Sequence, residues 1–226
     1  MKPSKAVITS EGYPAIAYSI GLFLFLAIAT LLLSSVILAV PAFISLLLVI
    51  FVVAFFRNPE RIPPADEGLL VAPADGTVVY VGPAEQEQLG ACQKVSIFMS
   101  VFNVHVNWAP CTAKVIERFY RPGRFLDVRH SKASSENEQL GLVLETEQGL
   151  RLVCVQIAGL IARRIHCYVD TGDCLKRGER YGMIRFGSRL DLYLPTAVTP
   201  LVVLGQVTAA GVTPLARLPQ ETDKER

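Results

Sequence analysis

The chain opens with a long apolar stretch that contains no charged residue. Lys2, Lys5 and Glu11 are the only charged residues before Arg57, so the stretch from Gly12 to Phe56 carries none. One crossing of a bilayer takes about 20 apolar residues, and the stretch is therefore long enough for two. A cleaved signal peptide is disfavoured, because the apolar part is too long and no small-residue cleavage site follows it.

Two features divide this stretch into a predicted pair of helices. Pro41 interrupts the apolar run, and Ser34 and Ser35 stand shortly before it. We therefore expect apolar helices near Ala15–Leu33 and Ala42–Phe56, joined as a tight hairpin. The second helix is short for a full crossing, which leaves a re-entrant hairpin as an alternative to two spans.

Basic residues flank the stretch on both sides. Lys2 and Lys5 precede it, and Arg57 and Arg61 follow it. Because basic flanks stay in the cytoplasm, a hairpin with both ends on that side fits this pattern, whereas a single span does not. We expect residues 1–56 to anchor a domain of residues 57–226 to the cytoplasmic side of a membrane.

Beyond the anchor, the pattern changes to short runs of strand character separated by turns. A linker with three prolines, "FFRNPERIPPADEG", comes first. Runs such as "GTVVYVG", "KVSIFMSVF" and "LDLYLP" follow, and they are rich in β-branched and aromatic residues. The segment Glu147-Gln148-Gly149, between "LVLET" and "LRLVCVQ", is typical of a hairpin turn. Few later windows have a helical period, so we predict a mainly β (α+β) domain after the helical hairpin.

A weak internal repeat refines this fold prediction. The spacing Val-x2-Gly-x5-Gly occurs at Val169 and again at Val202. With "APADGTV" these units resemble the strand-and-turn units of lipoyl- or biotin-carrier folds, which predicts a compact barrel-sandwich arrangement. A carrier also presents a lysine on a tight hairpin, and no such element occurs here, so the fold is kept and the carrier function is not.

Composition excludes several classes of function. The chain holds 22 basic and 20 acidic side chains, and the part after Phe56 is as evenly balanced as the whole. This balance offers no electrostatic case for nucleic acid. The five cysteines are odd in number and lack any C-x-x-C spacing. Reduced, mostly buried thiols are therefore expected in place of a zinc site or a disulfide framework.

The three histidines give no pattern of metal ligands. His105 lies in "FMSVFNVHVNWAP", where strand alternation places it on the same face as Asn103 and Asn107. A buried structural histidine and a functional one both fit that spacing. His130 heads a polar loop, and His166 shows no partner pattern. No pair has the i, i+4 spacing of a metal site.

Other polar positions have ordinary structural explanations beside functional ones. Asp75, in "APADGTV", is typical of an Asp-Gly turn. Arg163 and Arg164 would point to opposite faces of a strand, so one faces inward and needs an anionic partner, either a phospholipid phosphate or an internal carboxylate. The only Gly-Ser pair in the chain is Gly187-Ser188, in "FGSRL". It lacks the second glycine of G-x-S-x-G and precedes a strand, which excludes an α/β-hydrolase.

Five motifs, in order, resemble those of one enzyme family. "FFRNPER", "APADGTV", "FMSVFNVHVNWAP", "FLDVRHSKASSENE" and "RFGSRLDLYLP" are similar to the proenzyme of phosphatidylserine decarboxylase, in its short bacterial and archaeal form with a hydrophobic anchor. The resemblance runs from about Arg57 to Ala216. It implies a lyase of phospholipid biosynthesis at the bacterial inner membrane, which converts phosphatidylserine to phosphatidylethanolamine and CO2.

The resemblance also implies that the chain is a zymogen that cuts itself between Gly187 and Ser188. The Ser188 hydroxyl attacks the Gly187 carbonyl, and elimination from the resulting ester leaves a β chain of residues 1–187. The α chain, residues 188–226, then begins with a pyruvoyl group, the covalent cofactor formed from Ser188. Glycine suits the first step because it can adopt strained backbone angles.

The residues that match the family's Asp-His-Ser relay are Asp75, His105 and Ser188. In this assignment Asp75 orients the imidazole and His105 takes the hydroxyl proton. Longer family members carry a second histidine three residues further on, where this chain has Trp108. Whether His105 also protonates the product of decarboxylation is therefore left open.

The implied decarboxylation uses a Schiff base between the lipid amine and the pyruvoyl group, which accepts electrons as CO2 leaves. Arg163, Arg164 and His130 are the candidate contacts to the substrate. The expected partners are phosphatidylserine in the membrane and the α and β chains for each other, with a homo-oligomer left open and neither metal nor nucleic acid.

Two alternatives to a lipid decarboxylase carry different expectations. A pyruvoyl decarboxylase of a small soluble amino acid is disfavoured by the long apolar stretch near the N-terminus. A membrane-anchored, carrier-like β-domain would bind lipid without ever cutting itself. The sizes of the fragments in the purified protein distinguish this last alternative from the enzyme.

Overall fold

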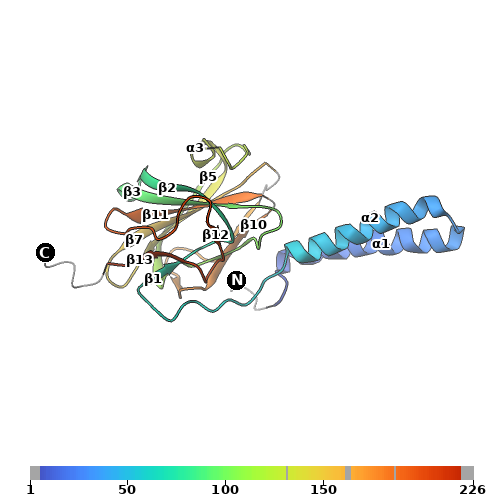
Figure 1. Cartoon of the computed structure of the whole chain (residues 1–226), viewed down its shortest axis with the longest axis horizontal. Coiled ribbons are helices and arrows are strands. Elements are labelled where there is room, and N and C mark those ends of the chain that lie inside the picture. The colour runs from blue at the N-terminus through green and yellow to red at the C-terminus, as the bar shows by residue number, and fades with distance from the viewer. Residues whose placement is uncertain (1–5, 131, 161–163, 186, 220–226) are drawn as a thin grey trace. The chain divides into compact units, whose positions relative to one another are not determined.

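A computed structural model describes residues 6–130, 132–160, 164–185 and 187–219. The chain divides into two compact units, of which one is Ser4–Glu60 and the other contains Arg61 and the residues that follow. The first unit is helical and the second is rich in β-strands (Figure 1).

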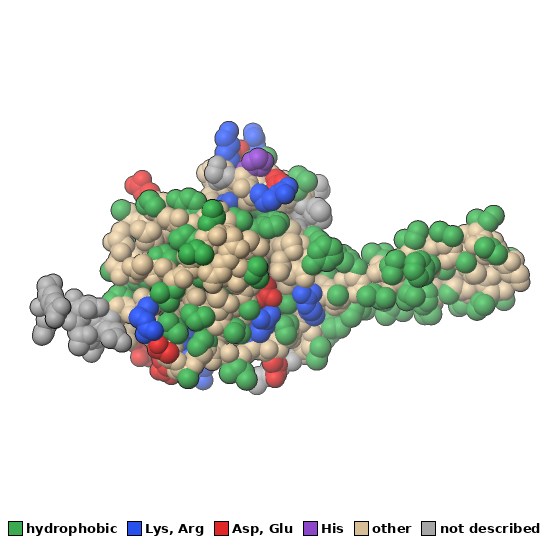
Figure 2. All heavy atoms as spheres, viewed as in Figure 1, with side chains coloured by type: hydrophobic (Ala, Val, Ile, Leu, Met, Phe, Trp, Pro, Cys, Tyr) green, Lys and Arg blue, Asp and Glu red, His purple; other side chains and the backbone are tan. Residues whose placement is uncertain are grey.

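The N-terminal unit is a pair of apolar helices. A short 3-10 turn, η1 (Ser10–Gly12), leads into α1 (Tyr13–Leu33), and α2 covers Val36–Phe55. Hydrophobic side chains lie over the surface of both helices (Figure 2). Each helix is long and apolar enough to cross a membrane, which is consistent with membrane association.

The second helix starts at Val36, earlier than the sequence pattern predicts. Pro41 lies inside α2, and the chain reverses at Ser34, which has a left-handed φ of 46°. Pro41 cannot donate a backbone hydrogen bond, so α2 continues through this proline with one hydrogen bond fewer. With 20 residues α2 is about 30 Å long, so its length no longer argues for a re-entrant hairpin.

The second unit is mainly β-sheet, as predicted. Its largest sheet is a curled half-barrel of eight strands in the order β12-β2-β3-β11-β7-β6-β5-β9. A three-stranded sheet has the order β4-β10-β8, and β1 pairs with β13. The bounds are β1 Leu69–Val71, β2 Gly76–Gln86, β3 Gly90–Met99, β4 Val106–Trp108, β5 Ala113–Arg121, β6 Gln139–Glu145, β7 Arg151–Ile157, β8 Ile165–Cys167, β9 Cys174–Leu175, β10 Arg180–Ile184, β11 Ser188–Pro195, β12 Val207–Thr208 and β13 Pro214–Arg217.

The hairpin predicted around Gly149 is confirmed. Strands β6 and β7 pair antiparallel along their whole length, and Gly149 has a φ of 76° in the turn between them. The polar segment between β5 and β6, where the sequence pattern does not decide between helix and loop, contains the four-residue helix α3 (Ala133–Glu136). This is the only helix in the described part of the second unit.

The cysteines are free thiols and most of them are inside the protein. Cys92, Cys111 and Cys154 are buried, Cys167 is half-buried and Cys174 is exposed. Burial raises the pKa of Cys111 to about 12. The expectation of reduced, mostly buried thiols is therefore confirmed.

Strand β11 lies in the middle of the large sheet, between β3 and β7. All of its residues but the last are buried, so both of its faces are covered. Leu190, Leu192 and Leu194 enter the main hydrophobic core on one face. The alternate residues Arg189, Asp191 and Tyr193 point to the other face. The strand that begins at Ser188 is thus held on both edges and on both faces.

Candidate active site

The Gly187-Ser188 bond stands at the head of β11. Ser188 is opposite Met99 in the ladder between β11 and β3, and its hydroxyl donates to the Met99 sulfur at 3.5 Å. Its side chain is fully buried, at 0% exposure. Gly187 has a φ of 61°, in the left-handed region that favours glycine. The sequence reason for a glycine at this position is therefore confirmed.

The carbonyl of Gly187 packs against a second glycine. A Cβ added to Gly159, just beyond the end of β7, would lie 2.0 Å from the Gly187 oxygen and 3.2 Å from the Gly187 carbonyl carbon. The same Cβ would lie 3.2 Å from a methyl group of Val128. No side chain fits in that space, so the position of the Gly187 carbonyl depends on glycine at 159. Sequence reasoning missed Gly159, for which no turn motif provides a signal.

His105 is buried just before β4, on the side of that segment that faces the large sheet. Its Nδ1 lies 3.0 Å from the Asn103 carbonyl oxygen, and its own carbonyl accepts the Ile184 amide at 3.2 Å. Asn107, two residues on and hence on the same face, reaches the Met99 sulfur. His105 therefore belongs to the face of β4 that looks toward the strand pair β3 and β11.

The opposite face of this segment carries Trp108, which packs in a separate cluster with Val104, Val106 and Ala210. The guanidinium groups of Arg61 and Arg180 lie 5.8 and 6.0 Å from the centroid of the Trp108 ring. Trp108 therefore points away from the face of His105. In this chain the residue at 108 supports the linker and β10 rather than the space around Ser188.

Asp75 lies directly before β2, at the end of the sheet where β3 ends and β11 begins. Its carboxylate makes an ion pair with Arg61 at 2.8 Å and accepts the Ala210 amide at 2.7 Å. Its observed partners are thus a linker arginine and a backbone amide. The orientation of His105 by Asp75 stays a prediction.

The predicted substrate contacts are spread over two loops. Arg164 is exposed immediately before β8, and its carbonyl accepts the Arg185 amide at 3.4 Å. His130 is exposed before α3, and its carbonyl accepts a hydrogen bond from Arg189 at 3.2 Å. Arg163 lies outside the described residues.

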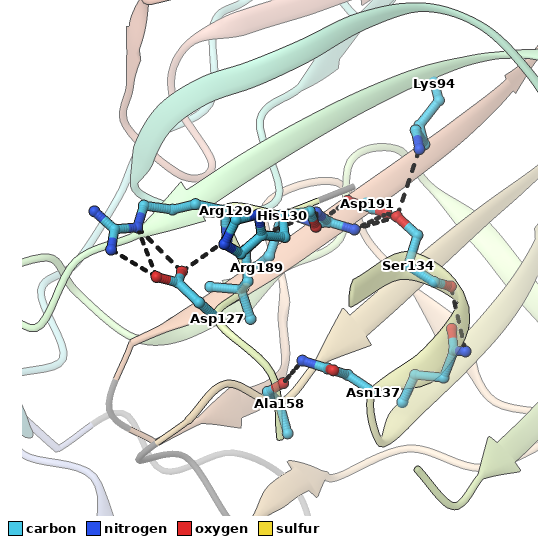
Figure 3. Close-up of polar contacts among 11 residues, drawn as sticks. Lys94, Asp127, Arg129, His130, Ser134, Asn137, Ala158, Arg189 and Asp191 are labelled. Atoms are coloured by element: carbon cyan, nitrogen blue, oxygen red, sulfur yellow. Dashed lines mark hydrogen bonds and ion pairs between the residues drawn. The ribbon is translucent and has the colours of Figure 1, made fainter. Parts of the chain in front are cut away.

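A buried ion pair next to Ser188 was not foreseen from the sequence. Arg189 and Asp191 are 4% and 0% exposed, and their side chains meet at 2.9 Å. Arg189 also donates to the Val128 carbonyl at 2.9 Å and to the Ser134 hydroxyl, which in turn donates to Asp191 at 2.8 Å (Figure 3). The alternation of Arg and Asp in the apolar run "SRLDLYLP" was the available signal, because two charges on one face of a buried strand must pair.

This Arg189 network joins β11 to the loop that covers it. Through Val128, His130 and Ser134 it fixes the segment between β5 and β6, and Val128 is also the residue that approaches Gly159. On the same face, burial raises the pKa of Tyr193 above its usual range, and the Asp191 carboxylate acts in the same direction.

Comparison with known proteins identifies the family. A family model described as phosphatidylserine decarboxylase matches residues 48–216, which is most of the chain. The chain belongs to the phosphatidylserine decarboxylase family. A protein of Trichlorobacter lovleyi, named phosphatidylserine decarboxylase proenzyme, is 68% identical over 218 residues, which are 96% of this chain and 100% of that protein.

Relatives with the same name occur in two Geobacter species. The protein of Geobacter sulfurreducens is 56% identical over 220 residues and that of Geobacter metallireducens 52% identical over 225, each covering 97% of this chain and 100% of the relative. Membership in the phosphatidylserine decarboxylase family indicates an enzyme, a decarboxylase. It confirms the resemblance drawn from the five motifs, and the matched region includes Asp75, His105 and the Gly187-Ser188 pair.

Proposed function

We propose that the chain is a membrane-bound phosphatidylserine decarboxylase that makes its own pyruvoyl group by cutting the bond between Gly187 and Ser188. The observation that carries the proposal is the geometry at the head of β11. The serine is fully buried, the preceding glycine is left-handed, and the glycine's carbonyl packs against the backbone of Gly159. The name proenzyme, which the relatives carry, is consistent with processing of this kind.

In the first step the Ser188 Oγ attacks the carbonyl carbon of Gly187. His105 takes the hydroxyl proton and returns it to the Ser188 nitrogen as the C–N bond breaks, so an ester replaces the amide. A base then removes the Cα proton of Ser188, and the Cβ–Oγ bond breaks with its electron pair, which releases the Gly187 carboxylate. The dehydroalanine that remains tautomerises to an imine, and water replaces its nitrogen as ammonia.

The residues around position 188 fit the group that would result. A pyruvoyl group is small and uncharged, and Ser188 lies in a buried site beside the Met99 thioether and the main hydrophobic core. Such a group supplies an electron sink for decarboxylation of an amino acid. The chain's own part is to hold the end of β11 and place the imidazole of His105 for proton transfer.

We assign the two apolar helices to the inner membrane, with the catalytic unit on the cytoplasmic side. Lys2 and Lys5 before the helices and Arg57 after them support that side. A diacyl lipid leaves a bilayer reluctantly, at about 0.8 kcal/mol for each buried CH₂, so an enzyme that acts on it gains from an anchor. Arg164 and His130 are the described candidates for contact with the lipid headgroup.

The proposal is tested by denaturing electrophoresis, intact mass and conversion of phosphatidylserine in mixed micelles. We expect two fragments, which correspond to residues 1–187 and 188–226. The smaller one should carry a ketone at its N-terminus that reacts with carbonyl reagents. Release of CO2 should accompany formation of phosphatidylethanolamine. Ser188→Ala should remain a single uncut chain without activity. His105→Ala should be cut at least about 100-fold more slowly, the usual contribution of a general base.

Two results would contradict the proposal. An active preparation that contains only the uncut chain would remove the pyruvoyl mechanism. Binding of lipid by an uncut, inactive wild-type protein would instead favour the alternative of a membrane-anchored, carrier-like β-domain that never cuts itself. Normal processing of His105→Ala would remove the histidine from the relay and leave the cut itself in place.

A further inference from the structure

Two buried amide side chains lie between the two sheets. Asn107 is on β4 in the small sheet and Gln156 is on β7 in the large one, and both are 0% exposed. The Gln156 Nε2 donates to the Asn107 Oδ1 at 2.9 Å. Gly182 on β10 leaves room for this pair, since a Cβ there would lie 2.8 Å from the Gln156 Nε2.

This pairing determines which end of the Asn107 amide faces Met99. Because the Asn107 oxygen is bound to Gln156, its Nδ2 is directed to the Met99 sulfur, at 3.8 Å. The same sulfur atom accepts the Ser188 hydroxyl, at 3.5 Å. An amide donor and the Ser188 hydroxyl thus converge on one atom in a buried site.

The amide nitrogen of Asn107 is a strong donor with a weak partner. Among the described residues, the Met99 sulfur is the only hydrogen-bond partner of this Nδ2, and a thioether is a poor acceptor. The Oε1 of Gln156 is buried and has no hydrogen-bond partner in the described part of the chain. Buried amide groups that lack good hydrogen-bond partners destabilise a folded protein. A function offers a reason for keeping them.

We propose that Asn107 Nδ2 is the donor that stabilises the Ser188 oxygen when the ester breaks, and that Gln156 is a positioning residue for it. This inference rests on the proposed self-cleavage. In the elimination the Cβ–Oγ electron pair moves onto Oγ as the Gly187 carboxylate leaves, while the Cα proton goes to the base. Negative charge therefore develops on Oγ, the atom that shares Met99 with Asn107. A fixed donor in a site without water typically accelerates such a step about 100- to 1000-fold.

The test separates the two steps of cleavage. Hydroxylamine, added at neutral pH together with a denaturant that opens the buried site, cuts an ester but not the peptide bond, so it reports the chain that has rearranged and not yet eliminated. In Asn107→Asp, which keeps the shape and loses the N–H donor, we expect elimination to slow about 100- to 1000-fold. Hydroxylamine should then split the full-length band into Met1–Gly187 and Ser188–Arg226, the smaller with an ordinary serine at its N-terminus.

Gln156→Leu provides a second variant and a test of positioning. It should slow the same step less than Asn107→Asp, and the double variant should be no slower than Asn107→Asp alone, because Gln156 acts through Asn107. Gln139→Leu is the matched control, since Gln139 is a buried amide opposite Ile157, on the other face of the same sheet. It should cut at the wild-type rate despite losing a buried amide.

The outcomes distinguish this inference from the proposed function. Wild-type protein that never cuts would overturn the proposed function itself. Wild-type protein that cuts, with Asn107→Asp or Gln156→Leu cutting equally fast and forming no hydroxylamine-sensitive chain, would overturn the role of the amides alone. If Asn107→Asp fails to fold, as judged by circular dichroism, Gln156→Leu decides by the same readout. A slow variant that accumulates no ester would also contradict the role proposed for the elimination step.

Discussion

At the scale of single residues, two glycines define the geometry of the bond that we propose is cut. Gly187 provides the left-handed conformation and Gly159 provides the space in which its carbonyl oxygen lies. The importance of Gly187 could be predicted, because the Gly-Ser pair is a local signal in the sequence. That of Gly159 could not, because it comes from the meeting of two strands that are far apart in the sequence.

Replacing Gly159 by alanine should slow self-cleavage without unfolding the protein. The added methyl group would lie 2.0 Å from the Gly187 oxygen, so the Gly187 backbone must move. A displacement of about 1 Å in a reacting group can cost about 100-fold in rate, and we expect a loss of that order. The rate at which fragments appear after pulse labelling measures it.

Gly82→Ala is the matched control for this substitution. Its methyl group would meet only the end of the Tyr80 side chain, at 3.2 Å, and that side chain can turn aside. We expect wild-type processing for Gly82→Ala. Equal processing rates for the two alanine variants would remove Gly159 from the site.

For the residues assigned to the relay, the family resemblance predicts which side chains take part but not which neighbours they contact. His105 and Ser188 are both buried, and the roles assigned to them stay predictions. The pairing of Asp75 with Arg61 depends on how the linker returns to the domain, and no local pattern encodes it. Met99 was missed as a neighbour of Ser188, and Asn107 as a neighbour of Met99, because these contacts arise between separate strands and sheets.

At the scale of elements, β11 is the strand on which the site depends. The run "LDLYLP" was predicted as a strand, and the structure confirms it within Ser188–Pro195. Its place between β3 and β7 could not be read from the pattern, since strands distant in the chain become neighbours through packing. The helix boundary at Val36 was misplaced for a different reason, because the prediction took Pro41 as a break between helices, whereas α2 continues through it.

The buried Arg189–Asp191 pair on β11 predicts how the free energies of unfolding of two variants compare. Arg189→Met leaves the Asp191 carboxylate buried without its cation, which should lower the free energy of unfolding by about 3–5 kcal/mol. The double variant Arg189→Met/Asp191→Leu removes both charges and should be more stable than Arg189→Met. Urea unfolding in detergent measures both, in a Ser188→Ala background so that every protein is one uncut chain.

The exposed pair Arg129–Asp127 is the control for this prediction. It joins similar side chains at 2.6 Å, with Arg129 68% exposed. Arg129→Met should cost no more than about 1 kcal/mol, as is usual for exposed pairs. If Arg189→Met lowers the free energy of unfolding by no more than about 1 kcal/mol, the role assigned to the buried pair is wrong.

At the scale of the whole molecule, the proposed cut falls inside a sheet rather than between domains. The residues after Gly187 supply β11, which pairs with β3 and β7, and also β12, which pairs with β2, and β13, which pairs with β1. Each of these strands is thus bonded to a strand on the other side of the cut. Several ladders and the Arg189 network would hold the two products together.

The fragments should therefore remain one particle after cleavage. In detergent without denaturant we expect the two chains to co-elute from a sizing column, at the volume of uncut Ser188→Ala. They should separate only when a denaturant breaks the sheet. A small fragment that elutes alone under native conditions would contradict this prediction.

The burial of Ser188 at the head of a central strand has one more consequence. Cofactors carried on a lysine hairpin swing between distant sites, because their attachment point is a mobile arm. A reactive group made from Ser188 would have no arm at all, since its backbone is fixed in the ladder with β3 from its first residue. Such a group cannot move toward its substrate. The lipid headgroup must therefore move to residue 188, and the surrounding loops must move to admit it.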